Sequence, residues 1–433
     1  MHRFTTTTVL LGLTLSLPVS AQTPAQAACT LVTADGHSYA AAMTGIDADM
    51  NLKMAPADGV PPTIPCRSIA EIRFGPPGHS DAPTLRPSDP PTPRRPLPHP
   101  EDIQVVLVNG DTLLGTLEPA EGDLLPVRSE SLGVVKLRLE SLSEVVFLAN
   151  RKALPAQKPD TSQGDVAVPV KGGLNFGSVT AIGRAGVEFY SKVFQQAETY
   201  TPDQLAAVYF TRLTDPAPEP ETLLAIAIAA DGSTFRGRIE GFTEGKLRLA
   251  TFHRAPGPDG KPLVLEIPAD RLATIYFKNG DVVYASDLDP VRTDEYPLMI
   301  RPVKAPANEP ALFKYRRDRS VEGNRLSIRG REFRKGLGVH ARSELVYPAA
   351  GRFKTFAATV GIDDERGGSG SGVFVVKADG KEIYRGELLH GISSAADLSV
   401  PVAGAKEVTL LVEFGDDGGV HAHADWGGAR FLK

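Results

Sequence analysis

The stretch Ile69-Ala70-Glu71-Ile72-Arg73-Phe74 returns three times later in this 433-residue chain with a similar order of apolar and small residues. In each copy apolar residues alternate with small or polar ones, and each copy closes on phenylalanine, which is the pattern of a half-buried β-strand. The later copies are Leu142-Ser143-Glu144-Val145-Val146-Phe147, Leu205-Ala206-Ala207-Val208-Tyr209-Phe210 and Leu272-Ala273-Thr274-Ile275-Tyr276-Phe277. A strand motif that recurs at intervals predicts an internally repeated, all-β architecture.

Each repeat also begins in a similar way, with a tight-turn dipeptide beside an apolar strand-like run. These dipeptides are Asp35-Gly36, Asn109-Gly110, Gly172-Gly173 and Asp231-Gly232. A second glycine follows five positions later at Gly115, Gly177 and Gly237, and Ala41 takes that place in the first repeat. Short strands with glycine at the bends predict a small SH3-like or Sm-like β-barrel, with a stack of hairpins as the alternative. We expect the four modules at 28–75, 103–150, 168–213 and 222–284.

The segments between the modules have the composition of linkers. Residues 76–102 contain Pro90-Pro91 and Pro93 near their centre, which predicts an extended, semi-rigid spacer. A second linker is expected at 151–167. We interpret the repeats as spacers or as modules that contact other proteins, such as components of the cell envelope.

The charge balance of the chain excludes some classes of partner. The formal net charge is -5, and the repeats show no basic stripe with interleaved aromatic residues, so nucleic acid is not expected as a partner. The 42 glycines and 36 prolines favour turn-rich β structure over long helices.

The N-terminus has the pattern of a signal peptide. Positive charge near Met1 is followed by an apolar run from Val9 to Val19 and by small residues that end at Ala21 or at Ala27. We assign residues 1–27 to this peptide and expect a secreted, periplasmic or cell-surface protein. The apolar run is too short to span a bilayer, so no transmembrane segment is expected.

The chain contains two cysteines, Cys29 and Cys66, and both fall within the first module. In an oxidising compartment they are expected to form a disulfide, which would stabilise the module by about 4 kcal/mol. A lipid-anchored Cys29 is the alternative, and Gln26, three residues upstream, disfavours it. Two thiols alone are too few ligands for a zinc site.

Residues 286–433 show a different pattern of short apolar strands separated by glycine-rich turns. This pattern predicts a β-sandwich, and the number of strands suits a jelly roll. The expected strands are Ser343 to Tyr347, Thr355 to Ile362, Gly372 to Ala378, Lys381 to Arg385, Leu398 to Val402, Glu407 to Phe414 and Ala429 to Leu432.

The same C-terminal region resembles the NPCBM family, which is described as the carbohydrate-binding module of glycosyl hydrolase family 98. The motifs that carry the resemblance occur in the family's order from about Ser286 to Lys433. They are Arg317-Asp318-Arg319-Ser320-Val321-Glu322-Gly323-Asn324, Lys335-Gly336-Leu337-Gly338-Val339-His340, Phe353-Lys354-Thr355-Phe356, Val360-Gly361-Ile362-Asp363-Asp364, Ala378-Asp379-Gly380-Lys381, Gly404-Ala405-Lys406-Glu407 and His423-Ala424-Asp425-Trp426. The resemblance implies a jelly-roll domain that binds a polysaccharide or another glycan, and it brings no catalytic residues.

Three residues are the candidate ligand contacts. Trp426 is the only tryptophan, and an exposed indole offers a flat face for a sugar ring. A place in the core is the competing interpretation. Asp425 and His340 are candidate partners for sugar hydroxyls, or alternatively residues that fix loops.

Two further clusters have weaker interpretations. His421 and His423, with acidic residues nearby at Asp416, Asp417 and Asp425, are best explained as a solvated acidic turn. A metal site is the alternative, with structural calcium favoured, and no other cofactor is expected. The stretch from Asp363 to Gly372 predicts a mobile loop, because it lacks the lysine and the helix of a phosphate-binding loop.

These observations predict an exported carbohydrate-binding protein that is not an enzyme. The alternatives are a glycoside hydrolase, or an accessory subunit of one, and a structural component of the cell envelope. Hydrolysis would require two carboxylates at a definite separation across a cleft, which a sequence does not reveal.

Overall fold

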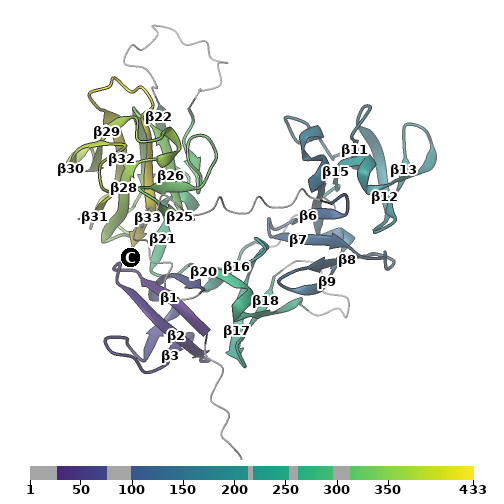
Figure 1. The fold of residues 1–433 in the computed structure, drawn as a ribbon, viewed down its shortest axis with the longest axis horizontal. Coiled ribbons are helices and arrows are strands. Elements are labelled where there is room, and N and C mark those ends of the chain that lie inside the picture. The colour runs from purple at the N-terminus through teal and green to yellow at the C-terminus, as the bar shows by residue number, and fades with distance from the viewer. Residues whose placement is uncertain (1–26, 76–98, 213–217, 253–261, 296–312) are drawn as a thin grey trace, which may run out of the picture.

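The computed structural model describes residues 27–75, 99–212, 218–252, 262–295 and 313–433 of the chain (Figure 1). Strands dominate these residues, and the helical segments among them are short 3-10 turns, so the predicted all-β class is confirmed. Residues 1–26 of the predicted signal peptide and most of the predicted linker at 76–102 lie outside the described residues. Ala27, assigned above to that peptide, is the first residue of strand β1.

The first repeat is a bent five-stranded sheet. Its spatial order is β5-β1-β2-β3-β4, and every neighbouring pair is antiparallel. A 3-10 turn, η1 (Cys66–Ser68), precedes the last strand. The strands are β1 (Ala27–Thr33), β2 (Ser38–Ile46), β3 (Asn51–Met54), β4 (Thr63–Pro65) and β5 (Ile69–Phe74). This strand order and the turn before the last strand fit the small SH3-like barrel expected from the sequence.

The other three repeats have the same strand order, in which the fifth strand pairs with the first. The second contains β6 (Asp102–Leu107), β7 (Thr112–Leu117), β8 (Leu124–Ser129), β9 (Gly133–Arg138), η2 (Leu139–Ser141), β10 (Leu142–Phe147) and the following turn η3 (Leu148–Ala153). The third contains β11 (Asp165–Pro169), β12 (Asn175–Gly183), β13 (Gly186–Ser191), β14 (Gln196–Tyr200), η4 (Pro202–Gln204) and β15 (Leu205–Tyr209). The fourth contains β16 (Leu224–Ala229), β17 (Thr234–Thr243), β18 (Lys246–Thr251), β19 (Val264–Pro268), η5 (Ala269–Arg271) and β20 (Leu272–Lys278). The third repeat therefore begins inside the range predicted as the linker 151–167.

The glycine five positions after each turn marks a close approach of two strands. A Cβ atom on Gly177 would lie 1.9 Å from the carbonyl oxygen of Tyr190, and one on Gly237 would lie 2.5 Å from that of Ala250. Gly115 is equally restricted, at 2.4 Å from the carbonyl oxygen of Arg128. These three glycines are needed because the neighbouring backbone occupies the space of a side chain.

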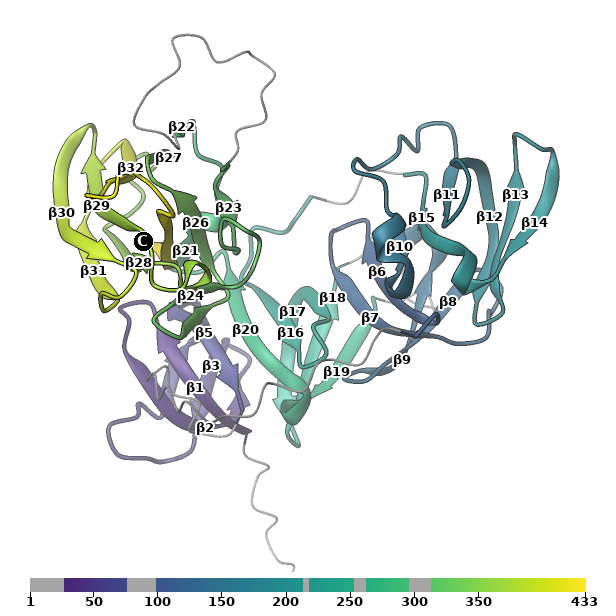
Figure 2. The ribbon, with the colours of Figure 1, turned by 45° about the horizontal axis from the view of Figure 1, so that its top comes forward.

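The four modules do not stand apart in space, although linker-like segments separate them in the sequence. The last strands of the repeats pair with one another, β5 with β20 and β10 with β15, in the same register. Ile72 faces Ile275 in one pair, and Val145 faces Val208 in the other. The recurring motif therefore forms the interface strand that joins repeat one to repeat four and repeat two to repeat three (Figure 2).

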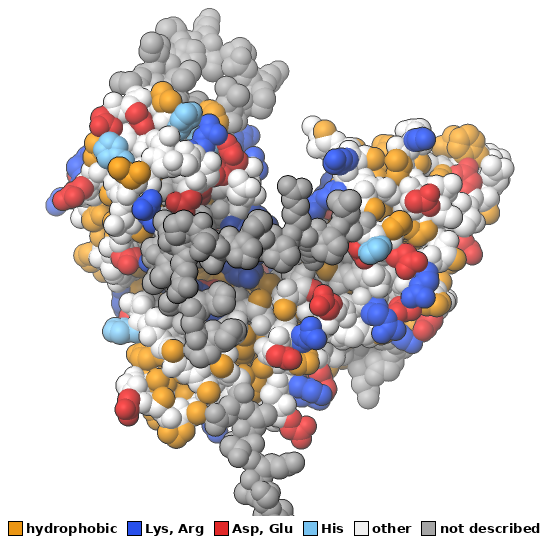
Figure 3. Space-filling model, viewed as in Figure 1, with side chains coloured by type: hydrophobic (Ala, Val, Ile, Leu, Met, Phe, Trp, Pro, Cys, Tyr) orange, Lys and Arg blue, Asp and Glu red, His pale blue; other side chains and the backbone are white. Residues whose placement is uncertain are grey.

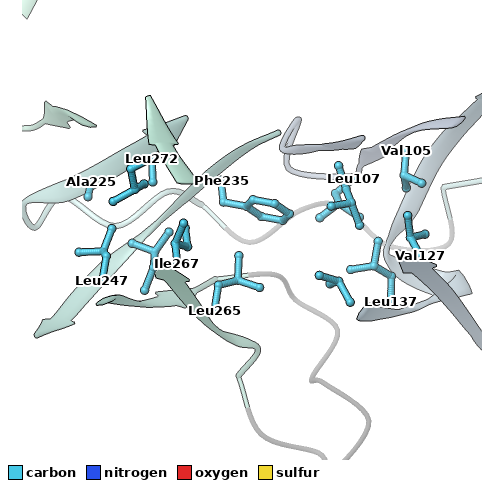
Figure 4. Packing of buried hydrophobic residues seen from close by; sticks show 14 of the residues in the cluster. Val105, Leu107, Val127, Leu137, Ala225, Phe235, Leu247, Leu265, Ile267 and Leu272 are labelled. Carbon is cyan, nitrogen blue, oxygen red and sulfur yellow. The ribbon is translucent and has the colours of Figure 1, made fainter. Parts of the chain in front are cut away.

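A second contact joins the fourth repeat to the second. Phe235 points from the fourth repeat toward Leu107 of the second, and both belong to one continuous buried cluster (Figure 4). Beside them Arg236 Nε donates to Oδ1 of the buried Asp111 at 2.8 Å. The four repeats therefore pack as one assembly, because apolar side chains and a partly buried ion pair cross between them.

The C-terminal domain is the predicted β-sandwich. One sheet has the order β23 (Arg316–Arg317), β26 (Gly336–His340), β33 (His423–Leu432), β28 (Thr355–Ile362) and β31 (Ala396–Pro401). The other has the order β22 (Arg292–Glu295), β27 (Ser343–Pro348), β32 (Glu407–Phe414), β29 (Ser371–Ala378) and β30 (Lys381–His390). The short hairpin β24 (Leu326–Ile328) and β25 (Arg331–Phe333) contacts β33 of the first sheet. The expected strands all fall within or close to these elements.

A strand of the repeat region continues into the sandwich. β21 (Val282–Tyr284) lies in the range assigned to the fourth repeat, but it pairs with β33 and extends the first sheet of the C-terminal domain. The turn η6 (Ala285–Asp287) follows it. The two regions therefore share a hydrogen-bonded strand.

The expected disulfide is not formed. Cys29 and Cys66 are both free and buried in the core of the first repeat. The Cys29 thiol lies at the backbone of Met43 and the Cys66 thiol at that of Leu52. Burial raises the pKa of Cys29 to about 11 and that of Cys66 to about 12.

Candidate functional site

Trp426 lies in the core of the sandwich, not on its surface. It belongs to β33, its relative exposure is 1%, and its ring packs edge-on against Phe374 at 5.1 Å and Phe356 at 6.0 Å. An indole covered by both sheets has no face free for a sugar ring. The prediction that Trp426 contacts the ligand was therefore wrong, and the competing core interpretation holds.

Asp425 is buried beside a second carboxyl group, Asp363, and the two hydrogen-bond to each other. The backbone NH of Ser327, on β24, donates to Oδ2 of both at 3.1 Å. Burial, and then the neighbouring Asp363, raise the pKa of Asp425 well above its usual range, so Asp425 holds the shared proton. This pair fastens the β24–β25 hairpin to the sheet, and Asp425 does not reach a ligand at the surface.

His340 is also buried, at 5% exposure, at the end of β26. Its Nδ1 lies 2.5 Å from the carbonyl oxygen of Ala341, and its ring stacks on Phe313 at 4.4 Å between centroids. Burial lowers the pKa of His340, so the ring is neutral near pH 7. His423 faces His340 across the strand pair, with the rings 5.4 Å apart.

Glu365, which the sequence placed in a mobile loop, is the centre of a polar network. It lies in the 3-10 turn η7 (Asp364–Arg366) and accepts hydrogen bonds from Ser320 Oγ at 2.5 Å and Asn324 Nδ2 at 3.1 Å. His423 Nδ1 lies 2.6 Å from its Oε1. Burial alone would raise the pKa of Glu365, but these hydrogen bonds outweigh it and lower the pKa. The turn is therefore tied down, and the interpretation as a mobile loop was wrong.

Trp426 thus lies in the core, whereas His340 and Asp425 lie toward one end of the sandwich but beneath its surface. The surface at that end is built from three loops, 367–370, 390–393 and 415–422, which we call the loop face. Gly391 N donates to Gly370 O at 3.0 Å, and a Cβ on Gly370 would meet the carbonyl of His421 at 2.2 Å, so the loops touch. The close packing of these glycines fixes the shape of the face.

The loop face combines exposed apolar and polar side chains. Ile392 is 74% exposed and Val420 is 60% exposed. His390 and His421 are accessible beside them, and His390 Nδ1 lies 3.8 Å from Asp416 Oδ1. Apolar side chains cover the CH groups of a sugar, while imidazole and carboxylate groups bond its hydroxyls. The signal for Ile392 and Val420 in the sequence was an isolated apolar residue within a glycine- or serine-rich loop.

The structure gives no support to a metal site at His421 and His423, which was the alternative to a solvated acidic turn. Among the described residues, no three or more His, Cys, Asp or Glu side chains are grouped so that they could hold an ion. His421 has a left-handed φ of 57° and is exposed, whereas His423 is buried, so the two do not share a strand face. Structural calcium remains a prediction.

On the surface shown in Figure 3, acidic and basic side chains are interspersed. No helix within the described ranges is long and apolar enough to cross a membrane.

The fold defines the C-terminal domain as a two-sheet β-sandwich module. Residues 298–432 match the NPCBM/NEW2 domain family, so the C-terminal domain is an NPCBM domain, and the resemblance read from the sequence is confirmed.

Two curated relatives each match part of the chain. A protein named "Putative endo-alpha-N-acetylgalactosaminidase" from Renibacterium salmoninarum is 36% identical over 111 residues, which are 26% of this chain and 7% of that protein. Alpha-1,3-galactosidase B from Akkermansia muciniphila is 30% identical over 133 residues, which are 29% of this chain and 17% of that protein. The chain therefore spans a small part of either relative.

Among solved structures, the CBM51 module from Clostridium perfringens GH95 in complex with methyl-galactose is 26% identical. It covers 35% of this chain and 99% of that module, with a TM-score of 0.30.

Proposed function

We propose that this chain is an exported, non-catalytic protein that binds a glycan through the loop face of its NPCBM domain. The observation that carries the proposal is the family match at residues 298–432 together with the exposed apolar pair Ile392 and Val420 at one end of that domain. Export rests on the signal peptide pattern, and cleavage after Ala21 would leave β1 intact.

The proposal gives the repeats the role of a scaffold. They pack on one another through the β5–β20 and β10–β15 pairs, and β21 joins them to the sandwich. The proposal also assigns to the repeats the contacts with envelope proteins.

The class of sugar that we propose for this chain is taken from the names of the two relatives, which are a galactosidase and a putative N-acetylgalactosaminidase. We expect the full chain to bind neutral glycans that end in one of these sugars. A glycan array followed by calorimetric titration of the positive glycans tests this. The absence of binding to any neutral glycan would overturn the proposal.

Two matched variants locate the site. Val420→Ser is expected to weaken binding by about tenfold, because the apolar contact with the sugar is lost. Val291→Ser is the control, since Val291 is 59% exposed but precedes β22 at the opposite end of the sandwich. Equal affinities for the two variants would place the site elsewhere.

The proposal that the chain is not catalytic is tested by mass spectrometry of the glycans after long incubation. Cleavage of a glycan would contradict that part of the proposal.

A further inference from the structure

A cavity of about 720 Å³ lies between the sandwich and the pair formed by the first and fourth repeats. Its walls come from β5 and β20 on one side and from β25, β28 and β33 on the other. The volume falls within the range of about 300–1,000 Å³ that is typical of small-molecule sites. The loop face is at the other end of the sandwich, so this cavity is a separate feature.

The junction that forms the cavity is held by several hydrogen bonds. Val283 pairs with Phe431 where β21 extends the sandwich sheet. Lys433 N donates to Asp281 O at 2.9 Å, and the hydroxyl of Tyr284 donates to Ala70 O at 3.0 Å. These bonds join residues from both regions, so the cavity is a fixed part of the fold.

Basic side chains outnumber acidic ones in the lining. The basic residues are Arg73, Arg325, Arg331, Arg334, Lys335 and Arg430, and the acidic residues are Asp35, Glu71, Glu332 and Asp397. Three of the acids each pair with one arginine: Glu71 with Arg73, Glu332 with Arg325 and Asp397 with Arg331. Asp35 is engaged by Thr33 and His37. Lys335 pairs with Asp287 and Asp318, which lie outside the lining. The positive charge of the lining that is left without an ion pair is therefore that of two arginines.

Arg430 and Arg334 supply that remaining charge. Arg430 donates to the carbonyl oxygens of Ala34 at 3.4 Å and Gly428 at 3.2 Å, and no carboxylate among the described residues pairs with it. Arg334 is exposed and has no ion pair with a described residue.

Arg331 adds an unused donor. Its Nη1 reaches Asp397 at 3.3 Å, but its Nε is buried and has no hydrogen-bond partner among the described residues. A buried donor without a partner costs free energy, which a ligand with a matching acceptor would recover.

We propose that this cavity binds an acidic saccharide, whose carboxylate or sulfate group lies against Arg331, Arg334 and Arg430. Guanidinium groups recognise both anions through forked hydrogen bonds. The cavity is much larger than a single inorganic anion, and Ser399 and Glu332 in its lining accept or donate hydrogen bonds to sugar hydroxyls. The saccharide part of this inference rests on the proposed function, whereas the anionic part rests on the cavity alone.

The test uses the full chain and three probes of equal length: a tetramer of galacturonic acid, a sulfated heparin tetrasaccharide and a neutral galactan tetramer. Calorimetric titration is expected to show tighter binding of the two acidic probes than of the neutral one. The acidic probe that binds more tightly shows whether the cavity prefers a carboxylate or a sulfate group. Arg334→Gln and Arg430→Gln are each expected to weaken acidic binding by about tenfold, because one charged hydrogen bond is lost. Raising the salt from about 0.05 M to about 0.5 M should weaken it further.

Arg319→Gln is the matched control, since Arg319 is an exposed arginine outside the lining. If Arg430→Gln loosens the junction, as a lower melting temperature would show, the exposed Arg334 still tests the site. Wild-type affinity for the acidic probes in Arg334→Gln would overturn the inference. Full displacement of the acidic probes by an equal concentration of inorganic sulfate would overturn its saccharide part.

The outcomes separate this inference from the proposed function. Neutral glycans that bind in a Val420-dependent manner, without any binding of acidic probes, would overturn the inference and leave the proposed function intact. Acidic probes that bind in an Arg334-dependent manner, without any binding of neutral glycans, would support the cavity and overturn the loop face.

Discussion

The hydroxyl of Tyr276 donates a hydrogen bond of 3.0 Å to Oε1 of Glu71, across the two strands that join the fourth repeat to the first. The other pair of repeats has the same residue types in the same register, because Tyr209 faces Glu144 across β10 and β15. Among the described residues, however, the Tyr209 hydroxyl makes no hydrogen bond, and Glu144 pairs with Lys158 at 2.7 Å. The two interfaces therefore share a backbone arrangement but differ in one buried hydrogen bond.

Replacing Tyr276 by phenylalanine should destabilise the assembly of repeats. A hydrogen bond to a charged group contributes about 1.5–3 kcal/mol, and Tyr276→Phe removes that donor from a buried carboxylate. We expect a matching drop in the free energy of unfolding, measured by calorimetry or by denaturant titration. Tyr209→Phe is the control, with an expected change below about 0.5 kcal/mol. Equal losses in the two variants would show that the hydrogen bond is not the cause.

Replacing Gly237 by alanine should also destabilise the fourth repeat. The new Cβ would lie 2.5 Å from Ala250 O and 2.9 Å from Leu249 Cγ, and the backbone cannot give way cheaply. Overpacking of this kind costs about 1–3 kcal/mol. Gly241→Ala, on the same strand β17, has no atom within 4 Å of the added Cβ and should change stability by less than about 0.5 kcal/mol. Calorimetry measures the melting temperature of both variants. An unchanged melting temperature for Gly237→Ala would refute the close approach of the two strands.

The sequence predicted the strands of the repeats well, because their burial is set locally by alternating residues. Leu272 to Phe277 has the period of a strand, and glycine at Gly237 marks a bend. The strand that pairs with β20 in another repeat was not predictable in the same way. β20 pairs with β16 inside its own module and with β5 about two hundred residues earlier, and this second contact depends on non-local packing.

The site was predicted less well for a related reason. Along β33, Trp426 points into the core, and its neighbour Asp425 points to the opposite face of the sheet. That face would be open to solvent in a bare sheet, but the β24–β25 hairpin covers it, and Ser327 caps the carboxyl group. A hairpin about a hundred residues away in the sequence thus decides the exposure of Asp425. Ile392 and Val420 were missed because loop contacts, not strand periodicity, place them.

Trp426→Ala should act on stability and not on glycan recognition. Removing a large buried aromatic side chain costs about 3–5 kcal/mol, and Trp426 packs against Phe356 and Phe374 in the centre of the sandwich. We expect a lower melting temperature for the sandwich, measured by calorimetry. At a temperature where the variant remains folded, its affinity for neutral glycans should match that of the wild type. A selective loss of binding without loss of stability would restore the ligand-contact interpretation.

The buried carboxyl pair predicts how the stability of the sandwich depends on pH. Burial raises the pKa of both Asp363 and Asp425 above the ordinary value of 3.8, so the folded chain holds a proton that the unfolded chain has released. Stability therefore falls as the pH rises above about 4 toward the raised pKa of the pair. Glu365 has the opposite effect, because its lowered pKa makes stability fall as the pH drops below about 4.5.

Asp425→Asn isolates the contribution of the pair. The amide keeps the shape of the protonated carboxyl and donates to Asp363 without titrating, so the loss of stability above about pH 4 should shrink or vanish. Asp416→Asn, a change of the same kind on an exposed side chain of the loop face, is the control and should keep the wild-type pH profile. Melting temperatures between about pH 4 and pH 8 measure the difference. A profile for Asp425→Asn that follows the wild type throughout would mean that the pair is ionised in the folded protein, and that Ser327 and the hairpin stabilise two charges instead of one.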